Sequence, residues 1–178
     1  MRRVLLVWHS RTGFARQMAD ALEMGAVSAA AEMDCGPDAF AVVRRRAADA
    51  SVDDLLSSDG YIFVAPENLA STSGEMLEFF HRSYYSAFTC TDGDDRSLLV
   101  GRPYALAVAA GSDGSSAARQ MGRICTGWRL RPVASEALVV QNGLPQDAKA
   151  IALPKHLPSE AAARCADLGG LLAATVLL

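Results

Sequence analysis

Three apolar segments constrain the fold of this 178-residue chain more than any other feature of its sequence. Residues 3–8, 60–65 and 104–109 are almost entirely apolar, and each runs into a turn that contains glycine or proline. A strand that is apolar at consecutive positions is buried on both faces, as in parallel sheets covered by helices on each side. The sequence therefore predicts an α/β domain with a doubly wound, mainly parallel sheet.

The rest of the chain continues this alternation of strands and helices. Two more strands are predicted at residues 39–43 and 132–140, which gives a five-stranded sheet. Helices are predicted at residues 13–26, 72–85, 115–128 and 158–174, and a short helix or turn at residues 52–56. No linker, repeat or low-complexity segment divides the sequence. We therefore expect a single domain that spans residues 1–178, which is long enough to bury a sizeable core.

Composition and charge limit the classes of partner. The chain is 51% hydrophobic, and 17 basic against 20 acidic residues give a net charge of −3. Weak acidity argues against a nucleic-acid partner. The apolar run after Met1 ends at His9 without a cleavage site, and the apolar C-terminal residues 168–178 are too few to cross a bilayer. We expect a cytoplasmic protein with no membrane partner.

The cysteines and histidines do not form a pattern that carries chemistry. The four cysteines lie far apart, without a C-x-x-C pair or a histidine at metal-ligand spacing: Cys35, Cys90, Cys125 and Cys165. Reduced, structural thiols are the simplest interpretation. The three histidines are scattered as well. We therefore predict no metal site and name no catalytic side chain.

The first predicted strand runs directly into a loop suited to phosphate. Residues 10–13 are Ser-Arg-Thr-Gly, and a helical pattern begins at once. A helix start presents unpaired N–H groups and a partial positive charge, Ser10 and Thr12 add hydroxyl donors, and Gly13 permits close approach. Neither G-x-G-x-x-G nor a P-loop ending is present, which argues against a dinucleotide or a nucleoside triphosphate at this loop. A purely structural role for Ser10 or Thr12 as a helix cap stays open.

Two further loops follow the carboxyl ends of neighbouring strands, where ligands bind in open α/β sheets. Residues 66–74 begin with Pro66, which ends the strand and stiffens the turn. In the other loop, two glycines and three serines at residues 111–116 allow close approach to a ligand edge. Structural alternatives remain open for both, with Ser71 or Thr72 capping one helix and Asp113 the next.

These loops carry a resemblance to a known family. Residues 10–13 after an apolar strand resemble the phosphate loop of the flavodoxin-like superfamily, usually Ser/Thr-x-Thr-Gly-Asn-Thr. Phe14 stands where that family usually has Asn, and Ala15 where it has a second Thr. Residues 66–82 resemble the flavin-ring loop of NAD(P)H-dependent FMN reductases and flavodoxin-like quinone reductases. The positions in register are Pro66, Ser71, Gly74, Met76, Phe79 and Arg82.

The resemblance implies a flavodoxin-like fold with strand order 2-1-3-4-5 and FMN as cofactor. It further implies an oxidoreductase that uses NAD(P)H to reduce a quinone, a flavin or a similar small acceptor, in a homo-oligomer. The implied cofactor-binding residues are Ser10, Arg11, Thr12, Gly13, Phe14 and Ala15 for the phosphate, Pro66, Glu67, Asn68, Leu69, Ser71 and Gly74 beside the ring, and Gly111, Ser112 and Gly114 at its pyrimidine side.

Two other functions are compatible with the same fold. One is a flavodoxin-type electron carrier that docks on protein partners, although such carriers usually present a strongly acidic face and this chain has a net charge of −3. The other is a flavodoxin-like module that no longer binds FMN. Uptake of FMN distinguishes the reductase and the electron carrier from a module that no longer binds FMN. Oxidation of NAD(P)H then distinguishes the reductase from the carrier.

Overall fold

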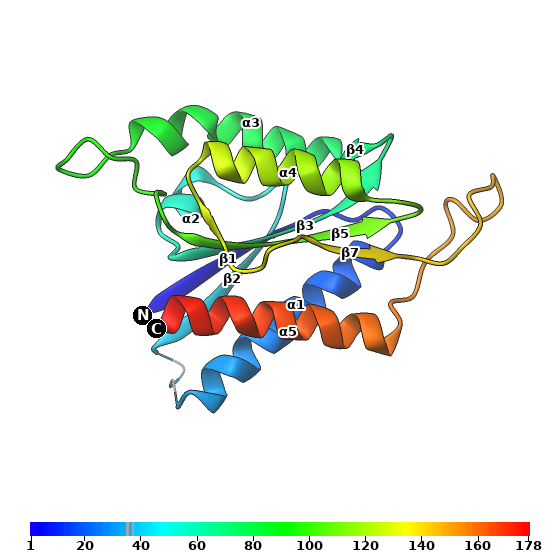
Figure 1. Ribbon diagram of the computed structural model, residues 1–178, viewed down its shortest axis with the longest axis horizontal. Helices are drawn as coiled ribbons and strands as arrows, with labels where there is room; N and C mark the ends of the chain where they lie inside the picture. Colours follow the sequence, from blue (N-terminus) through cyan, green and yellow to red (C-terminus); the bar gives the residue numbers. More distant parts are fainter. Residues whose placement is uncertain (35, 37) are drawn as a thin grey trace.

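A central sheet lies between two layers of helices in the computed structural model, which describes residues 1–34, 36 and 38–178 (Figure 1). The strands are β1 (Arg2–Trp8), β2 (Phe40–Arg46), β3 (Gly60–Asn68), β4 (Ser71–Thr72), β5 (Pro103–Ala110), β6 (Arg131–Pro132) and β7 (Leu138–Gln141). The helices are α1 (Phe14–Glu32), α2 (Val52–Leu56), α3 (Gly74–Thr89), α4 (Ser115–Gly127) and α5 (Ser159–Leu177). Helices α3 and α4 cover one face of the sheet, and α1 and α5 cover the other.

Strand β1 is buried on both of its faces, as its sequence predicts. Val4 and Leu6 pack into the core cluster formed with α1 and α5, whereas Leu5 and Val7 pack into the cluster on the other face. All four side chains are fully buried. The alternation of side chains along a strand explains why both layers need apolar residues from one short segment.

The strand order confirms the doubly wound prediction. Strands β2, β1, β3 and β5 lie side by side in that order and are parallel, and β6 and β7 both pair with the far edge of β5. The predicted fifth strand over residues 132–140 is wrong as one continuous strand. Its residues 133–137 lie opposite only Ala105 and Leu106 of β5, so they bulge out of the ladder and separate β6 from β7.

Helix α1 continues to Glu32, well beyond the predicted end at residue 26. Gly25 lies inside it at a close crossing with α5, because a Cβ at Gly25 would stand 2.0 Å from Ala166 O. A Cβ at Gly169 of α5 would likewise stand 2.0 Å from Leu22 O. The two helices therefore touch backbone to backbone. None of the helices in the described residues has an apolar stretch long enough to cross a bilayer.

Other boundaries also extend past their predictions. Strand β2 reaches Arg46, because its ladder with β1 continues to the Trp8–Arg46 pair. The Arg44 guanidinium lies 5.0 Å from the Trp8 ring centre and bonds to acidic groups of α1, which suits an edge strand that carries charge. Helix α5 extends to Leu177 because its apolar face continues into the core.

The cysteines agree with a structural role. Cys90, Cys125 and Cys165 are free thiols, and Cys35 lies outside the described residues. Burial raises the pKa of Cys165 to about 11, so this thiol is protonated at neutral pH. Within the described part of the chain, no group of histidine, cysteine and carboxylate side chains is arranged to hold a metal ion.

Candidate functional site

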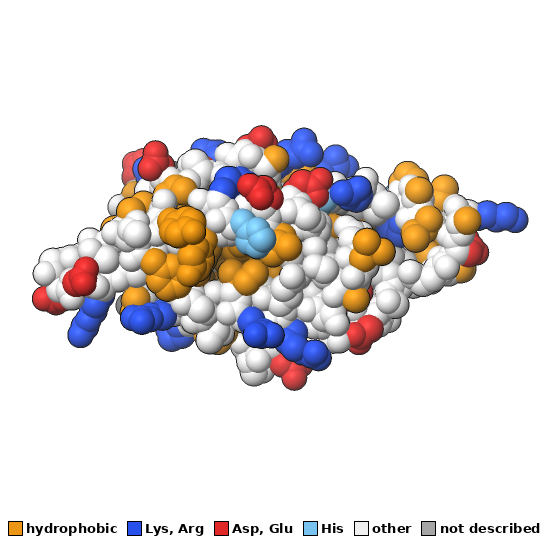
Figure 2. Space-filling model, turned by 90° about the horizontal axis from the view of Figure 1, so that it is seen from above, with side chains coloured by type: hydrophobic (Ala, Val, Ile, Leu, Met, Phe, Trp, Pro, Cys, Tyr) orange, Lys and Arg blue, Asp and Glu red, His pale blue; other side chains and the backbone are white. Residues whose placement is uncertain are grey.

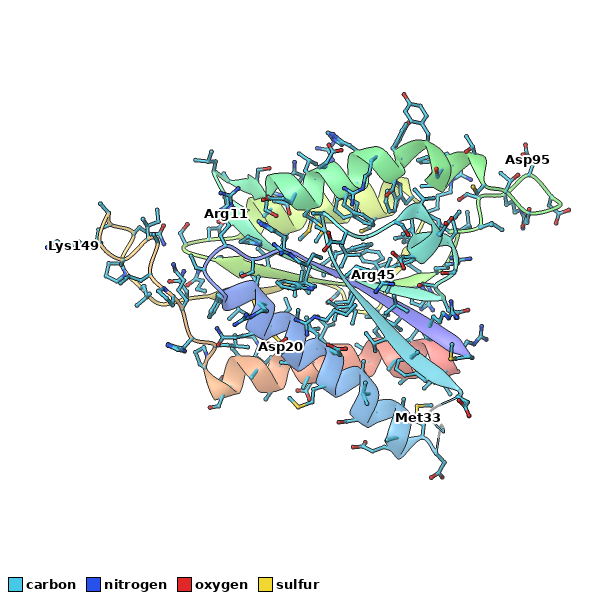
Figure 3. The ribbon with its side chains drawn as sticks, turned by 180° about the vertical axis from the view of Figure 1, so that it is seen from behind. Arg11, Asp20, Met33, Arg45, Asp95 and Lys149 are labelled. Carbon is cyan, nitrogen blue, oxygen red and sulfur yellow. The ribbon has the colours of Figure 1, made fainter. Side chains whose placement is uncertain are left out.

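Four segments meet at the carboxyl edge of the sheet and enclose a cavity of about 360 Å³. They are the β1–α1 loop, the β3–β4 hairpin, the β5–α4 loop and the long segment between β7 and α5. Figure 1 places the hairpin and the long segment at one end of the molecule and both termini at the other. In Figure 3, Arg11 and Lys149 mark the cavity end, and Asp95 marks the opposite end.

The cavity brings together most of the residues predicted to bind a cofactor. The predicted residues that line it are Ser10, Arg11, Thr12, Phe14, Ala15, Pro66, Glu67, Asn68, Leu69, Gly111 and Ser112. The predicted residues that do not line it are Gly13, Ser71, Gly74 and Gly114. The predicted residues therefore fall on three walls of the cavity, whereas Ser71 and three of the predicted glycines lie outside its lining.

Helix α1 begins at the base of the cavity without a side-chain cap. Its N-cap is Gly13, which has a left-handed backbone with φ 87°, and within the described chain no side chain caps this helix. The hydroxyl of Ser10 accepts a hydrogen bond from the Gly13 N–H at 3.1 Å. Gly13 precedes the first helical residue, Phe14, so this bond does not occupy an N–H group of the first turn. The N–H groups of the first turn at Phe14 and Ala15 are therefore available to a ligand.

The second wall is a β-hairpin instead of the predicted loop. Strand β3 continues to Asn68, and Ser71–Thr72 returns antiparallel to it as β4, so α3 begins at Gly74 and not at residue 72. The turn residues Leu69 and Ala70 both have left-handed backbones, with φ 53° and φ 56°. This conformation costs roughly 1–2 kcal/mol per non-glycine residue. Leu69 is fully exposed at the tip.

The hairpin is held by two contacts to the α4 region. Ser71 Oγ and the Thr72 N–H both donate to Gln120 Oε1, at 2.9 and 2.8 Å. Glu67 Oε2 accepts from the Gly114 N–H at 3.0 Å. Ser71 therefore anchors the hairpin, and neither Ser71 nor Thr72 caps α3, whose N-cap is Ser73 without a side-chain bond.

The third wall contains two glycines at which an added Cβ would come within 3 Å of a neighbouring side chain. Gly114 is the N-cap of α4 with φ 72°, and a Cβ there would stand 2.5 Å from Val139 Cγ1. A Cβ at Gly111 would stand 2.3 Å from Gln146 Nε2. Asp113 is not the N-cap, although its carboxylate accepts from the Ser115 N–H at 3.2 Å. By contrast, a Cβ at Gly74 would meet nothing within 4 Å, so no other part of the protein packs closely against this glycine.

Sequence reasoning missed the fourth wall, residues 142–158, which have no regular helix or strand. The residues of this segment that line the cavity are Asn142, Pro145, Gln146, Ile151 and Lys155. Two signals could have found it: the segment follows the carboxyl end of the last strand, and long irregular connections in compact domains are commonly functional.

Structural comparisons identify the fold, although no protein-family model and no curated protein matches the sequence. A flavodoxin from the domain Archaea superposes with a TM-score of 0.71 at 14% identity, covering 98% of both chains. The chain has the flavodoxin-like fold. An oxidoreductase from Corynebacterium diphtheriae gives a TM-score of 0.67 at 19% identity, covering 99% of this chain and 97% of that one. A flavodoxin, WrbA-like protein from Agrobacterium tumefaciens gives 0.63 at 14%, covering 99% and 96%.

A buried histidine lies next to the first loop of this flavodoxin-like domain. His9 Nε2 lies 3.2 Å from Glu75 Oε1, and Arg11 Nη2 lies 3.7 Å from the other oxygen of that carboxylate. Burial lowers the pKa of His9, and the nearby Glu75 opposes this shift. A hydrogen bond from its own N–H, followed by the charges of His9 and Arg11, lowers the pKa of Glu75. Arg11 is thus drawn towards Glu75 at the rim of the cavity.

The cavity of the flavodoxin-like domain combines polar donors with aliphatic surface. The start of α1 and the hydroxyls of Ser10 and Thr12 suit a phosphate, and Pro66 and Leu69 offer apolar contact to a flat ring. Phe14 is the one aromatic residue among the described residues that line the cavity, and it is 2% exposed. A phosphorylated ligand with a flat ring therefore fits the chemistry of these walls, with aliphatic packing in place of ring stacking.

Proposed function

We propose that the cavity binds FMN and that the protein uses NAD(P)H to reduce a quinone, a flavin or a similar small acceptor. The observation that carries this proposal is the uncapped start of α1 at the base of the cavity, beside the hydroxyls of Ser10 and Thr12. Backbone donors and a helix dipole at one point form a phosphate site that does not depend on particular side chains.

In this proposal each wall has a defined task. The N–H groups of Phe14 and Ala15 and the hydroxyl of Thr12 hold the phosphate, and Pro66 and Leu69 shield the ring from water. FMN, when bound, supplies the hydride-transfer chemistry, and the protein supplies placement and electrostatics. Glu67 is the one acidic residue among the described lining residues, and its carboxylate is engaged by Gly114. We therefore assign no catalytic acid or base.

Titration with FMN tests the binding site. Flavin fluorescence quenching and the visible spectrum of the purified protein report uptake. Thr12→Asp places a negative charge where the phosphate is expected, and the start of α1 tolerates an acidic group well. We expect Thr12→Asp to lose FMN binding, whereas the neutral and similarly sized Thr12→Asn retains most of it. Purified protein that takes up no FMN would contradict the proposal and support a flavodoxin-like module that does not bind flavin.

Anaerobic oxidation of NADH and NADPH tests the activity. We expect reduction of the bound flavin by at least one of the two, followed by reoxidation with a quinone or free flavin. A yellow protein that oxidises neither nucleotide would instead support the flavodoxin-type electron carrier. The net charge of −3 favours the enzyme over the carrier, because carriers rely on a strongly acidic docking face.

We also propose a homo-oligomer, formed through the outer face of α3. Tyr84, Tyr85 and Phe88 on this helix are 50%, 74% and 39% exposed, and Figure 2 shows hydrophobic side chains gathered on the α3–α4 side. Sedimentation of the wild type against Tyr85→Glu tests this, with a smaller species expected for the variant. A cytoplasmic location stays a prediction, which cell fractionation would test.

A further inference from the structure

Lys155 is a buried cation without an acidic partner. It is 9% exposed, and its Nζ donates to two backbone carbonyls, Ile151 O at 2.8 Å and Leu153 O at 3.2 Å. Within the described residues, no carboxylate lies within ion-pair distance of it. Lysine is rarely buried unless its charge is compensated, because an ammonium group loses much hydration on burial. The two carbonyls leave its positive charge unpaired and one of its three N–H bonds free.

The same residue is fixed against the start of α1. The Lys155 N–H donates to Thr12 O at 3.3 Å, so the two backbones lie side by side. Gln17 secures this arrangement from α1, because its Nε2 donates to Lys155 O at 2.7 Å and its Oε1 accepts from the Leu157 N–H at 2.9 Å. Lys155 and Thr12 also line the same cavity.

The other charged residues of this cavity are already engaged. Arg11 is 64% exposed in its side chain and lies towards Glu75, and Glu67 binds the Gly114 N–H. The side chains at the first turn of α1, Phe14 and Ala15, carry no polar group. Among the described lining residues, Lys155 is therefore the one buried charge that an anion could neutralise, and a buried cation attracts an anion more strongly than an exposed one.

We propose that Lys155 Nζ binds the phosphate group of the ligand in this cavity, so that the protein selects FMN over riboflavin by a buried cation. This inference rests on the proposed function, since it takes FMN as the ligand. The phosphate would then receive backbone N–H groups from α1 on one side and a charge-assisted hydrogen bond from Lys155 on the other.

Binding of FMN and riboflavin to the same variants tests the proposal. Lys155→Met keeps most of the apolar stem and removes the charge. We expect it to weaken FMN binding by roughly 10- to 100-fold and to leave riboflavin binding within about twofold, because riboflavin lacks the phosphate. Lys149→Met is the matched control at the exposed tip of the same segment (Figure 3), and it should bind both ligands as the wild type does.

Each other outcome has a distinct meaning. Equal FMN affinity in Lys155→Met and the wild type would overturn the role of Lys155 and leave the proposed function intact. Equal losses for FMN and riboflavin would assign Lys155 a structural role and overturn its role in phosphate selection. Wild-type protein that binds neither ligand would overturn the proposed function itself and this inference with it.

A second measurement is made on the wild-type protein, so it does not depend on how Lys155→Met folds. Lys149 and Lys155 are the two lysines of the whole sequence, so lysine labelled with carbon-13 gives two sets of side-chain signals, which Lys149→Met assigns. We expect FMN to shift the Cε signal of Lys155 and riboflavin to shift it far less, while the Lys149 signal stays in place. Equal shifts of the Lys155 signal with both ligands would contradict phosphate binding by this residue.

Discussion

The carboxylate of Glu67 accepts a hydrogen bond from the backbone N–H of Gly114 at 3.0 Å, which ties the β3–β4 hairpin to the start of α4. Together with the bonds of Ser71 and Thr72 to Gln120, this bond holds two walls of the cavity against each other. The bond also gives a partner to one of the backbone N–H groups that a helix start leaves unpaired. Glu67 thus positions two walls of the site, and we assign it no role as a catalytic acid or base.

Removing this link should weaken ligand binding. Glu67→Ala removes the bond to Gly114 and so loosens one wall of the cavity, and we expect FMN binding to weaken by about 1 kcal/mol, or about fivefold in Kd. Glu67→Gln keeps an acceptor oxygen and should stay within about twofold of the wild type. Fluorescence titration measures both, and an unchanged Kd for Glu67→Ala would contradict this role.

The same substitution should have opposite effects in two helices. Gly25→Ala forces a methyl group into the backbone of Ala166, so we expect a destabilisation of about 2 kcal/mol or more. Gly122 of α4 has only Leu106 Cδ1 near its added Cβ, at 3.9 Å. Gly122→Ala should therefore stabilise the protein by about 0.5–1 kcal/mol through helix propensity. Chemical denaturation of both variants checks the sign, and a neutral Gly25→Ala would refute the close crossing.

Glycine at the hairpin tip should stabilise the fold. Ala70 has a left-handed backbone at φ 56°, which glycine adopts without steric cost. We expect Ala70→Gly to raise the free energy of unfolding by about 0.5–1 kcal/mol after allowing for the more flexible unfolded chain. In the right-handed helix α4, Ala118→Gly should instead lower it by a similar amount. Thermal unfolding compares the two variants, and the tip conformation is wrong if both are destabilised alike.

The buried His9 should make stability depend on pH in mildly acidic solution. Burial lowers its pKa below the usual 6.5, so the unfolded chain binds the proton more tightly than the folded protein does. The stabilisation is therefore present above about pH 6.5 and is lost as the pH falls through the lower pKa of the folded state. The lowered pKa of Glu75 adds a further loss that begins nearer its own usual value of 4.5.

Denaturation at a series of pH values from about 7.5 to about 5.5 measures this slope. His9→Gln keeps a donor for Glu75 and removes the titrating group, so its stability should vary less with pH over that range. His156 is exposed, and His156→Gln serves as the control that should retain the slope of the wild type. A slope that survives in His9→Gln would place its origin at another group.

Much of the fold could be predicted because burial on both faces leaves a clear record in sequence. Val4 to Val7 are apolar without interruption, and each of the two layers takes alternate residues from them. The turn at Leu69 and Ala70 could not be predicted, because left-handed turns are usually marked by glycine or asparagine and neither stands at these two positions. The bulge between β6 and β7 likewise depends on pairing with β5, which no local pattern encodes.

The candidate site was predicted where it depends on local chemistry. Ser10, Thr12 and Gly13 predict the start of a helix, and in the structure α1 begins there, at the cavity. Lys155 could not be found in this way, because its position depends on Gln17 and Thr12, which are far from it in the sequence. Gly74 illustrates the reverse: it matches the motif, but a Cβ at this position would meet no protein atom within 4 Å.

The close backbone contact of α1 with α5 also fixes the spacing between the starts of these two helices, which lie at the cavity. Both helices start at the carboxyl edge of the sheet, α1 after the β1–α1 loop and α5 after the segment that carries Lys155. Gly25 lies about two helical turns from Gln17, and a single added methyl group there would spread the two helix starts. A larger residue at Gly25 or Gly169 would therefore change the spacing of two walls of the cavity, although neither residue lines it.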